Sequence, residues 1–217
     1  MKITHCRLKR TTQLKLLEYL VLEVTARSAA DLLEIQANSA ILFYRKVREV
    51  IASHLKDESQ EIFDGLVELD ESYFGGVRKG KRGRGATGKV AVFGILKRGG
   101  KVFTQVVSDT KSETLMPLII RKIAPDSVVY TDSFRSYDVL DISSFHHKRI
   151  NHELLFAEGR NHINGIENFW SQAKRTLRRY NGIDRKSFPL FLKECEFRFN
   201  YGTPSEQLKT LRLWCDI

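Results

Sequence analysis

Apolar positions in the first quarter of the chain recur every three or four residues, the spacing that gives a helix one apolar face. The pattern predicts a helix over residues 12–24, a short second helix ending at Leu33, and a longer third helix ending near His54. Residues 55–63 are charged and are expected to form a linker. We therefore expect a small helical domain over residues 1–57.

Capping residues mark the expected starts of the second and third helices. Ser28, followed three residues later by Asp31, fits a capping box. Asn38 or Ser39 is the expected N-cap of the third helix. A short helix, a tight turn and a longer helix are typical of a helix-turn-helix DNA-binding domain.

Basic residues on the third helix favour that interpretation. The apolar face of this helix is expected to consist of Phe43, Val47, Val50 and Ile51. Arg45 and Arg48 then face outward, with Tyr44 on the flank, so we expect both arginines to contact DNA. An ordinary three-helix bundle that binds nothing is the alternative.

From Leu66 onward, runs of β-branched and aromatic residues replace the helical spacing. Strands are expected over residues 66–69, 90–96, 102–107, 128–130 and 149–151. Helices are expected over residues 112–123, 134–140, 162–180 and 187–198. This order predicts an α/β domain over residues 62–217, built on a mixed sheet with flanking helices.

The distribution of charge indicates a polyanionic partner. Lysine and arginine number 36 against 26 acidic residues, a net charge of +10. Basic residues cluster in the glycine-rich segment 78–89 and again in segment 160–186, as expected for phosphate contacts. The residues of these segments that we expect to contact DNA are Lys79, Lys81, Arg82, Arg84, Lys174, Arg175 and Arg178.

Three acidic residues stand where an α/β sheet presents chemistry. Asp70 ends the first predicted strand, Asp132 follows the fourth, and Glu167 lies on the late helix. Two carboxylates from neighbouring strands and one from a helix can hold a pair of Mg²⁺ ions, which support phosphodiester transfer. Lys174 lies two helical turns after Glu167, so it faces the same side and could touch a substrate phosphate.

Other acids compete for the role of metal ligand. Glu68 and Glu71 flank Asp70, and strand alternation places Glu68, but not Glu71, on the face of Asp70. Glu153 and Glu158 precede the late helix and lack the spacing of Glu167.

Three segments closely resemble the DDE transposases of bacterial insertion sequences, in the group with an HxNGxENFW signature. They occur in order, as VELDESYFGG (67–76), VYTDSFRSYD (129–138) and HINGIENFWSQAKR (162–175). Asp132 and Glu167 are separated by 34 residues, close to the spacing of that class. The resemblance covers about residues 60–200 and implies an RNase H-like catalytic domain.

The resemblance also implies an activity. Such a protein binds the terminal inverted repeats of its element and catalyses metal-dependent DNA cleavage and strand transfer into target DNA. Magnesium would be the cofactor, with Mn²⁺ as a substitute. The metal ligands would be Asp70, Asp132 and Glu167, and Lys174 would be the downstream basic residue of the catalytic site.

The resemblance further implies that the protein acts on double-stranded DNA, at the element ends and at the target, as at least a dimer. Some members of the family use Asn or His in place of the third acid, so Asn164 and Asn168 are minor candidates for that role. Two other functions remain possible: a DNA-binding remnant or repressor without catalysis, and a different RNase H-like nuclease.

The location of the protein follows from what the chain lacks. No stretch approaches the roughly 20 apolar residues that span a bilayer. The first ten residues lack the apolar run of a signal peptide. We therefore expect a cytoplasmic, nucleoid-associated bacterial protein with no membrane contact.

Overall fold

The chain forms two compact units. The computed structural model describes residues 3, 6–58, 60, 62–75, 89–132, 145–150, 163–180 and 182–217. One unit comprises residues 1–59 and 175–217, and the other comprises residues 60–174. The boundary lies inside helix α5 (Asn164–Leu177), near its C-terminal end. Among the described residues, no helix is long and apolar enough to cross a membrane.

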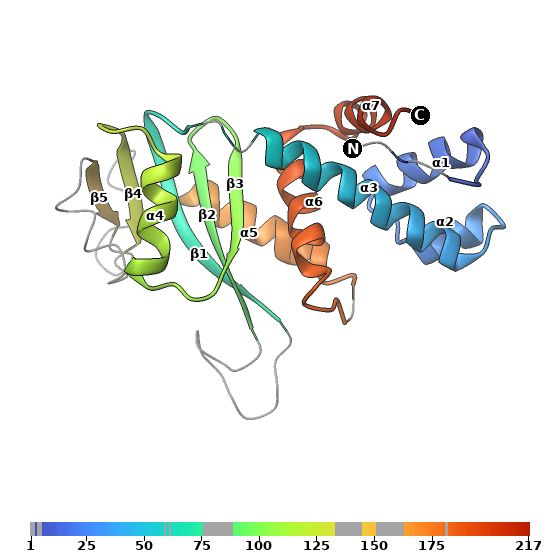
Figure 1. The fold of residues 1–217 in the computed structure, drawn as a ribbon, viewed down its shortest axis with the longest axis horizontal. Helices are drawn as coiled ribbons and strands as arrows, with labels where there is room; N and C mark the ends of the chain where they lie inside the picture. Colours follow the sequence, from blue (N-terminus) through green and yellow to red (C-terminus); the bar gives the residue numbers. More distant parts are fainter. Residues whose placement is uncertain are drawn as a thin grey trace. The chain divides into compact units, whose positions relative to one another are not determined.

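The unit of residues 60–174 contains a five-stranded mixed sheet in the order β3-β2-β1-β4-β5 (Figure 1). Its strands are β1 (Leu66–Phe74), β2 (Val90–Lys97), β3 (Val102–Val107), β4 (Val128–Asp132) and β5 (His146–Ile150). The pairs β1–β2 and β2–β3 are antiparallel, whereas β1–β4 and β4–β5 are parallel. The mixed sheet with flanking helices expected from the sequence is confirmed. The helix expected over 134–140 lies outside the described residues.

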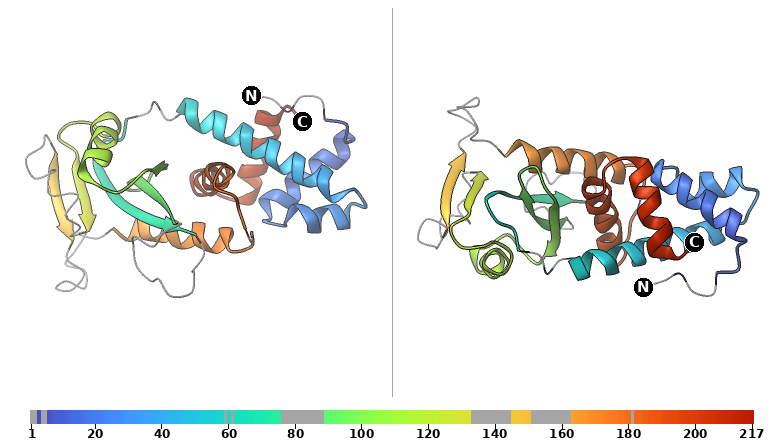
Figure 2. Two further views of the ribbon diagram at one scale, coloured as in Figure 1. Left: turned by 60° about the horizontal axis from the view of Figure 1, so that its bottom comes forward. Right: turned by 90° about the horizontal axis from the view of Figure 1, so that it is seen from above.

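Strand alternation divides the sheet into two faces with different neighbours. Helix α4 (Ser112–Lys122) covers one face, and the part of α5 that belongs to this unit covers the other (Figures 1 and 2). Val67 and Leu69 of β1 pack in one core cluster with Leu115 and Ile119 of α4. The even-numbered residues of β1 therefore face α5.

Helix α5 lies close against its face of the sheet. Its predicted apolar stripe is confirmed, because Ile166, Phe169, Trp170, Ala173 and Leu177 are all buried. Gly94 of β2 makes the close approach possible, since a Cβ there would lie only 2.6 Å from Cζ2 of Trp170. The remaining face of α5 is left to polar residues.

The other unit is helical and combines both ends of the chain. Its helices are α1 (Arg10–Val21), α2 (Ala26–Leu32), α3 (Ala37–Glu58), α6 (Phe188–Asn200) and α7 (Pro204–Cys215). Helix α6 packs on α3, and α7 packs on α1 and α3. Residues 175–217, which the sequence interpretation placed with the catalytic domain, thus belong to the compact unit of the N-terminal helices.

Several helix boundaries differ from those expected. Helix α1 ends at Val21, and α3 begins at Ala37, so Asn38 and Ser39 lie in its first turn and neither is its N-cap. Thr25, not Ser28, is the N-cap of α2, because the Thr25 hydroxyl accepts the backbone N–H of Ser28 at 3.2 Å. Helix α3 continues through the expected linker to Glu58, because buried Leu55 extends its apolar stripe by one more turn. Between α2 and α3, Glu34 adopts a left-handed backbone conformation (φ 52°), a conformation more often taken by glycine in a tight turn.

Arg48 does not face outward, and this expectation was wrong. Its side chain is buried, with Nε 2.5 Å from Oε2 of Glu194 on α6. Arg198 donates to the other carboxylate oxygen of Glu194 at 2.6 Å. Arg48 lies on the α3 face that also buries Tyr44 and Ile51, and its partner is 146 residues away in sequence, which explains why local spacing could not reveal it.

Truncating Glu194 is expected to destabilise the helical unit. Glu194→Ala leaves two arginines in a buried site without their shared carboxylate, and removing one partner of a buried ion pair costs about 3–5 kcal/mol. Chemical denaturation of the full chain measures the loss. Glu49→Ala removes a partly exposed carboxylate from the same helix bundle and should cost about 1 kcal/mol or less. Equal effects of the two substitutions would contradict a structural role for the buried network.

Candidate functional site

The parallel pairing of β1 with β4 brings two acids together. Leu66 pairs with Val128, and the same register continues to Glu68 and Tyr130, where the pairing ends. Continued by two residues, this register places Asp70 beside Asp132. By strand alternation both acids belong to the sheet face that α5 covers.

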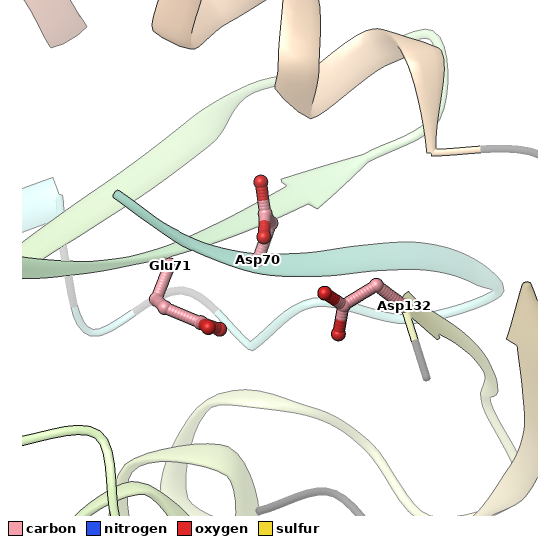
Figure 3. Close-up of side chains that lie close together, drawn as sticks. All are labelled: Asp70, Glu71 and Asp132. Carbon is pink, nitrogen blue, oxygen red and sulfur yellow. The ribbon is translucent and has the colours of Figure 1, made fainter. Parts of the chain in front are cut away.

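The carboxylates of Asp70, Glu71 and Asp132 form the acidic cluster of the structure. One oxygen from each lies within 4.8 Å of the others. Figure 3 shows Asp70 and Glu71 leaving opposite sides of β1, with Asp132 reaching toward them from the end of β4. Because the pairing of β1 with β4 stops before these residues, the strand edge is open to side chains from both faces.

The sequence interpretation placed Asp70 at the end of the first strand. In the structure Asp70 lies inside β1, because the strand continues to Phe74. Burial raises the pKa of Asp70 from its usual 3.8 to about 7, and the negative charges of Glu71, Asp132 and Glu167 add to the effect. Negative charge on Asp70 is therefore unfavourable in the folded protein, and a bound cation would offset it.

Glu167 is exposed on the first turn of α5 and lies within electrostatic reach of Asp70. It is not a member of the 4.8 Å group, whose third member is Glu71. Strand alternation had argued against Glu71, and Glu71 does leave the opposite face of β1. The signal that was missed is the place where the β1–β4 pairing ends, which depends on tertiary structure and not on local sequence.

Glu68 has a different surrounding from the cluster acids. It is almost completely buried, and its two carboxylate oxygens accept hydrogen bonds from Arg98 and from the backbone of Ile166. Glu68 therefore joins β1 to Arg98 and to the start of α5. The further competitors Glu153 and Glu158 lie outside the described residues.

The polar residues predicted on α5 lie on one exposed side of the helix. Asn164, Glu167, Asn168 and Lys174 are all exposed. The Lys174 ammonium is 5.9 Å from the centre of the Phe74 ring, at the end of β1. The carboxamide oxygen of Asn168 accepts a hydrogen bond from Gln172 at 3.3 Å.

The donor atoms of the acidic cluster fit a hard divalent cation. Carboxylate oxygens are the ligands that Mg²⁺ and Mn²⁺ prefer, and Mg²⁺ usually takes one or two carboxylates with waters and substrate phosphate. The described residues of the cluster provide three carboxylates from adjacent strands.

The basic residues expected to contact DNA have different positions. Arg45 is exposed on α3, where its Nε lies 3.1 Å from Glu49, while Arg48 is buried. Arg175 and Arg178 are exposed at and beyond the end of α5. Lys79, Lys81, Arg82 and Arg84 lie outside the described residues.

Comparison with known families decides the classification. The family described as the ISXO2-like transposase domain matches residues 62–200. This chain belongs to the ISXO2-like transposase family. The match starts just before β1, ends with α6, and contains every acid of the site. The resemblance to insertion-sequence transposases is thereby confirmed.

Two relatives extend the comparison of this ISXO2-like transposase. An uncharacterized transposase-like protein of Haemophilus influenzae is 56% identical over 112 residues, which cover 52% of this chain and 91% of that protein. An uncharacterized protein in the transposable element ISH50 of Halobacterium salinarum is 28% identical over 188 residues, covering 77% of this chain and 63% of that protein.

Solved structures with some likeness to this transposase include two Mos1 complexes. The Mos1 strand transfer complex has a TM-score of 0.42 at 12% identity and covers 100% of this chain and 78% of that one. A pre-cleavage Mos1 transpososome has a TM-score of 0.40 at 11% identity and covers 92% and 75% of the two chains. The overall likeness is low, and the family assignment rests on the sequence match.

Replacing Asp70 should stabilise the metal-free protein in a pH-dependent way. Because folding raises the pKa of this carboxyl group to about 7, the folded state holds a proton that the unfolded state loses from about pH 4 upward. The free energy of unfolding of the wild-type protein therefore falls as the pH rises from about 4 to about 7. In EDTA, we expect Asp70→Asn to raise the melting temperature by about 2–4 °C at pH 8, for a gain of about 1 kcal/mol.

At pH 5 the same substitution should change the melting temperature much less, since wild-type Asp70 is then protonated. Asp126→Asn is the matched control, because Asp126 is exposed and its left-handed backbone conformation suits asparagine. A stabilisation by Asp70→Asn that is identical at both pH values would argue against charge repulsion in the cluster.

Proposed function

We propose that this chain is an insertion-sequence transposase that binds the terminal inverted repeats of its element and catalyses metal-dependent DNA strand cleavage and strand transfer. The observation that carries the proposal is the acidic cluster at the β1–β4 edge, in a chain that belongs to the ISXO2-like transposase family. The substrate is double-stranded DNA at the element ends and at the target. The cofactor is Mg²⁺, with Mn²⁺ as a substitute.

Asp70 and Asp132 are the proposed metal ligands from the sheet, and Glu167 is the proposed ligand from α5. Strand alternation supports this set, because the β1–β4 register, continued by two residues, assigns Asp70 and Asp132 to the sheet face that α5 covers. The effect of the Glu167 charge on the pKa of Asp70 also supports it. Glu71 is the competing third ligand, because it already lies in the 4.8 Å group.

The proposed reaction is an in-line attack on phosphorus without a covalent protein–DNA intermediate. A divalent metal pair, when bound, activates the attacking oxygen and stabilises the leaving oxygen. The carboxylates of Asp70 and Asp132 hold the negative charge that fixes such cations at one edge of the sheet. Lys174, exposed two turns after Glu167, is placed to neutralise a phosphate of the DNA strand.

Binding of the element ends is assigned to the N-terminal helices and to the basic segments of the chain. Arg45 on α3 and the exposed Arg175 and Arg178 are the proposed contacts among the described residues. Lys79, Lys81, Arg82 and Arg84 complete the set from the sequence. Because two element ends must be joined, the protein is proposed to act as at least a dimer on DNA, in the cytoplasm.

An end-cleavage assay tests the proposed reaction. The purified chain is incubated with a duplex bearing the element end and Mg²⁺ or Mn²⁺, beside Asp132→Asn. We expect wild type to nick the duplex at the end in a metal-dependent manner, and the variant to lose at least about 10³-fold in rate, because it removes a carboxylate from the metal site. Asp126→Asn, an exposed acid six residues earlier, should cleave like wild type.

The same assay separates the competing functions. Specific binding without cleavage under either metal would favour a DNA-binding remnant or repressor. Cleavage that is not confined to the element end would favour another RNase H-like nuclease. Parallel assays of Glu167→Gln and Glu71→Gln identify the third ligand as the residue whose replacement abolishes the nick.

Arg45→Ala should weaken binding to the element end. The Arg45 side chain is 63% exposed on α3 and is the arginine of this helix that can reach DNA, since Arg48 is buried. We expect about tenfold weaker binding in a gel-shift or anisotropy assay, typical of one lost arginine contact. Lys209→Ala is the control, because Lys209 is also exposed but lies on α7, outside the N-terminal helices. Equal losses for both variants would sink the assignment of α3.

A further inference from the structure

Behind the acidic cluster, three side chains connect the elements that carry the acids. Glu68 of β1, Arg98 of the turn between β2 and β3, and Tyr130 of β4 form this group, called here the support layer. We propose that the support layer positions Asp70, Asp132 and Glu167 relative to one another, with Glu68 as its central positioning residue. The inference rests on the proposed metal site and names residues that do not themselves bind the metal.

Glu68 holds the first turn of α5. Its side chain is 1% exposed, and its Oε2 accepts the backbone N–H of Ile166 at 2.9 Å. The first N–H groups of a helix have no partner within the helix, and the positive end of the helix dipole favours a carboxylate there. Ile166 directly precedes Glu167, so this hydrogen bond fixes the distance between β1 and the part of α5 that carries Glu167.

Gly165 allows this contact to form. A Cβ at Gly165 would lie 2.5 Å from Cδ2 of Leu96 and 2.9 Å from Oε2 of Glu68. Both distances are shorter than van der Waals contact, so a side chain at this position would force the ends of the Leu96 and Glu68 side chains to shift. Glycine immediately before Ile166 thus leaves room for the Glu68 carboxylate to reach the Ile166 N–H.

Arg98 connects Glu68 to the strand of Asp132. Its Nε donates to Oε1 of Glu68 at 2.8 Å, and its guanidinium carbon lies 3.7 Å from the centre of the Tyr130 ring. The backbone N–H of Arg98 also donates to the carbonyl of Leu66 at 2.9 Å, which ties the turn to β1. A planar guanidinium can lie flat on a ring while its edge bonds a carboxylate, whereas a lysine ammonium has no plane with which to stack.

The three contacts share a simple relation to the acids. Glu68 precedes Asp70 by two residues on one face of β1, and Tyr130 precedes Asp132 by two residues on β4. The Ile166 N–H precedes Glu167 by one residue on α5. Each acid therefore extends from a backbone segment that the support layer fixes. Three carboxylates that repel one another need such a restraint if they are to stay in place before a cation arrives.

Hydrogen exchange tests the positioning without any metal. In Glu68→Ala, the amide of Ile166 loses its acceptor, so the peptide that begins near Ile163 should exchange about tenfold faster at that site. Glu68→Gln keeps an amide oxygen for the Ile166 N–H and should retain most of the protection. Unchanged exchange in a folded Glu68→Ala would overturn the proposal, whatever the protein does with DNA.

Binding of Mn²⁺ alone to the full chain, measured by calorimetry, tests the consequence for the acids. Residues behind a metal site typically change affinity by about 10–100-fold, and we expect at least about tenfold weaker Mn²⁺ binding in Glu68→Ala, with partial recovery in Glu68→Gln. Glu194→Gln is the matched control, a buried glutamate that also pairs with arginine but lies in the helical unit. It should lower the melting temperature and leave Mn²⁺ binding unchanged.

The outcomes separate this inference from the proposed function. Faster exchange in Glu68→Ala with no Mn²⁺ binding by wild type would support the positioning of α5 and defeat the metal site. Wild-type Mn²⁺ binding that is equally strong in folded Glu68→Ala would defeat the support layer and leave the metal site standing. If Glu68→Ala does not fold, Arg98→Lys takes its place. This substitution keeps the positive charge but removes the stack on Tyr130, so it should weaken Mn²⁺ binding. Undiminished Mn²⁺ binding by Arg98→Lys would overturn the proposal.

Discussion

The parallel pairing of β1 with β4 is the constraint on which the acidic site depends. Its register brings Asp70 and Asp132 side by side although 62 positions separate them in the chain. The pairing also ends just before these residues, which opens the strand edge and allows Glu71 to join them. Without this register, the two aspartates would be ordinary strand residues. The helix that carries Glu167, the proposed third ligand, comes within electrostatic reach of Asp70 because one face of the same sheet accepts it closely.

Placing several carboxylates at one edge of the sheet is electrostatically unfavourable for the folded state. Burial, and then the charges of Glu71 and Asp132, make the charged form of Asp70 unfavourable and raise its pKa. Rigid attachment of the acids is then an advantage, because flexible side chains would move apart. Glu68 and Arg98 provide attachment points from neighbouring backbone segments, and they do so with a neutralised pair that adds no net charge near the cluster.

In the helical unit, part of the positive charge serves packing. Burial by itself raises the pKa of Glu194, but the charges of Arg198 and Arg48 outweigh it and hold that pKa below its usual range. Arg198 also donates to the carbonyls of Leu20 and Val21 at the end of α1. The network thus connects helices from both ends of the chain. A basic residue on α3 is consequently not always a residue available to DNA, as Arg45 and Arg48 demonstrate.

Local sequence determined the identity and order of the elements, the apolar stripe of α5, and the three segments that place the chain among insertion-sequence transposases. These features depend on residue periodicity and on motifs within a few turns of chain, which are readable without coordinates. Tertiary structure alone decided that Glu71 reaches Asp132, that Glu68 holds α5, and that Arg48 is buried against Glu194. Each of these contacts joins residues whose distance depends on strand register or on helix packing. Strand register and helix packing are not encoded in the spacing of neighbouring side chains.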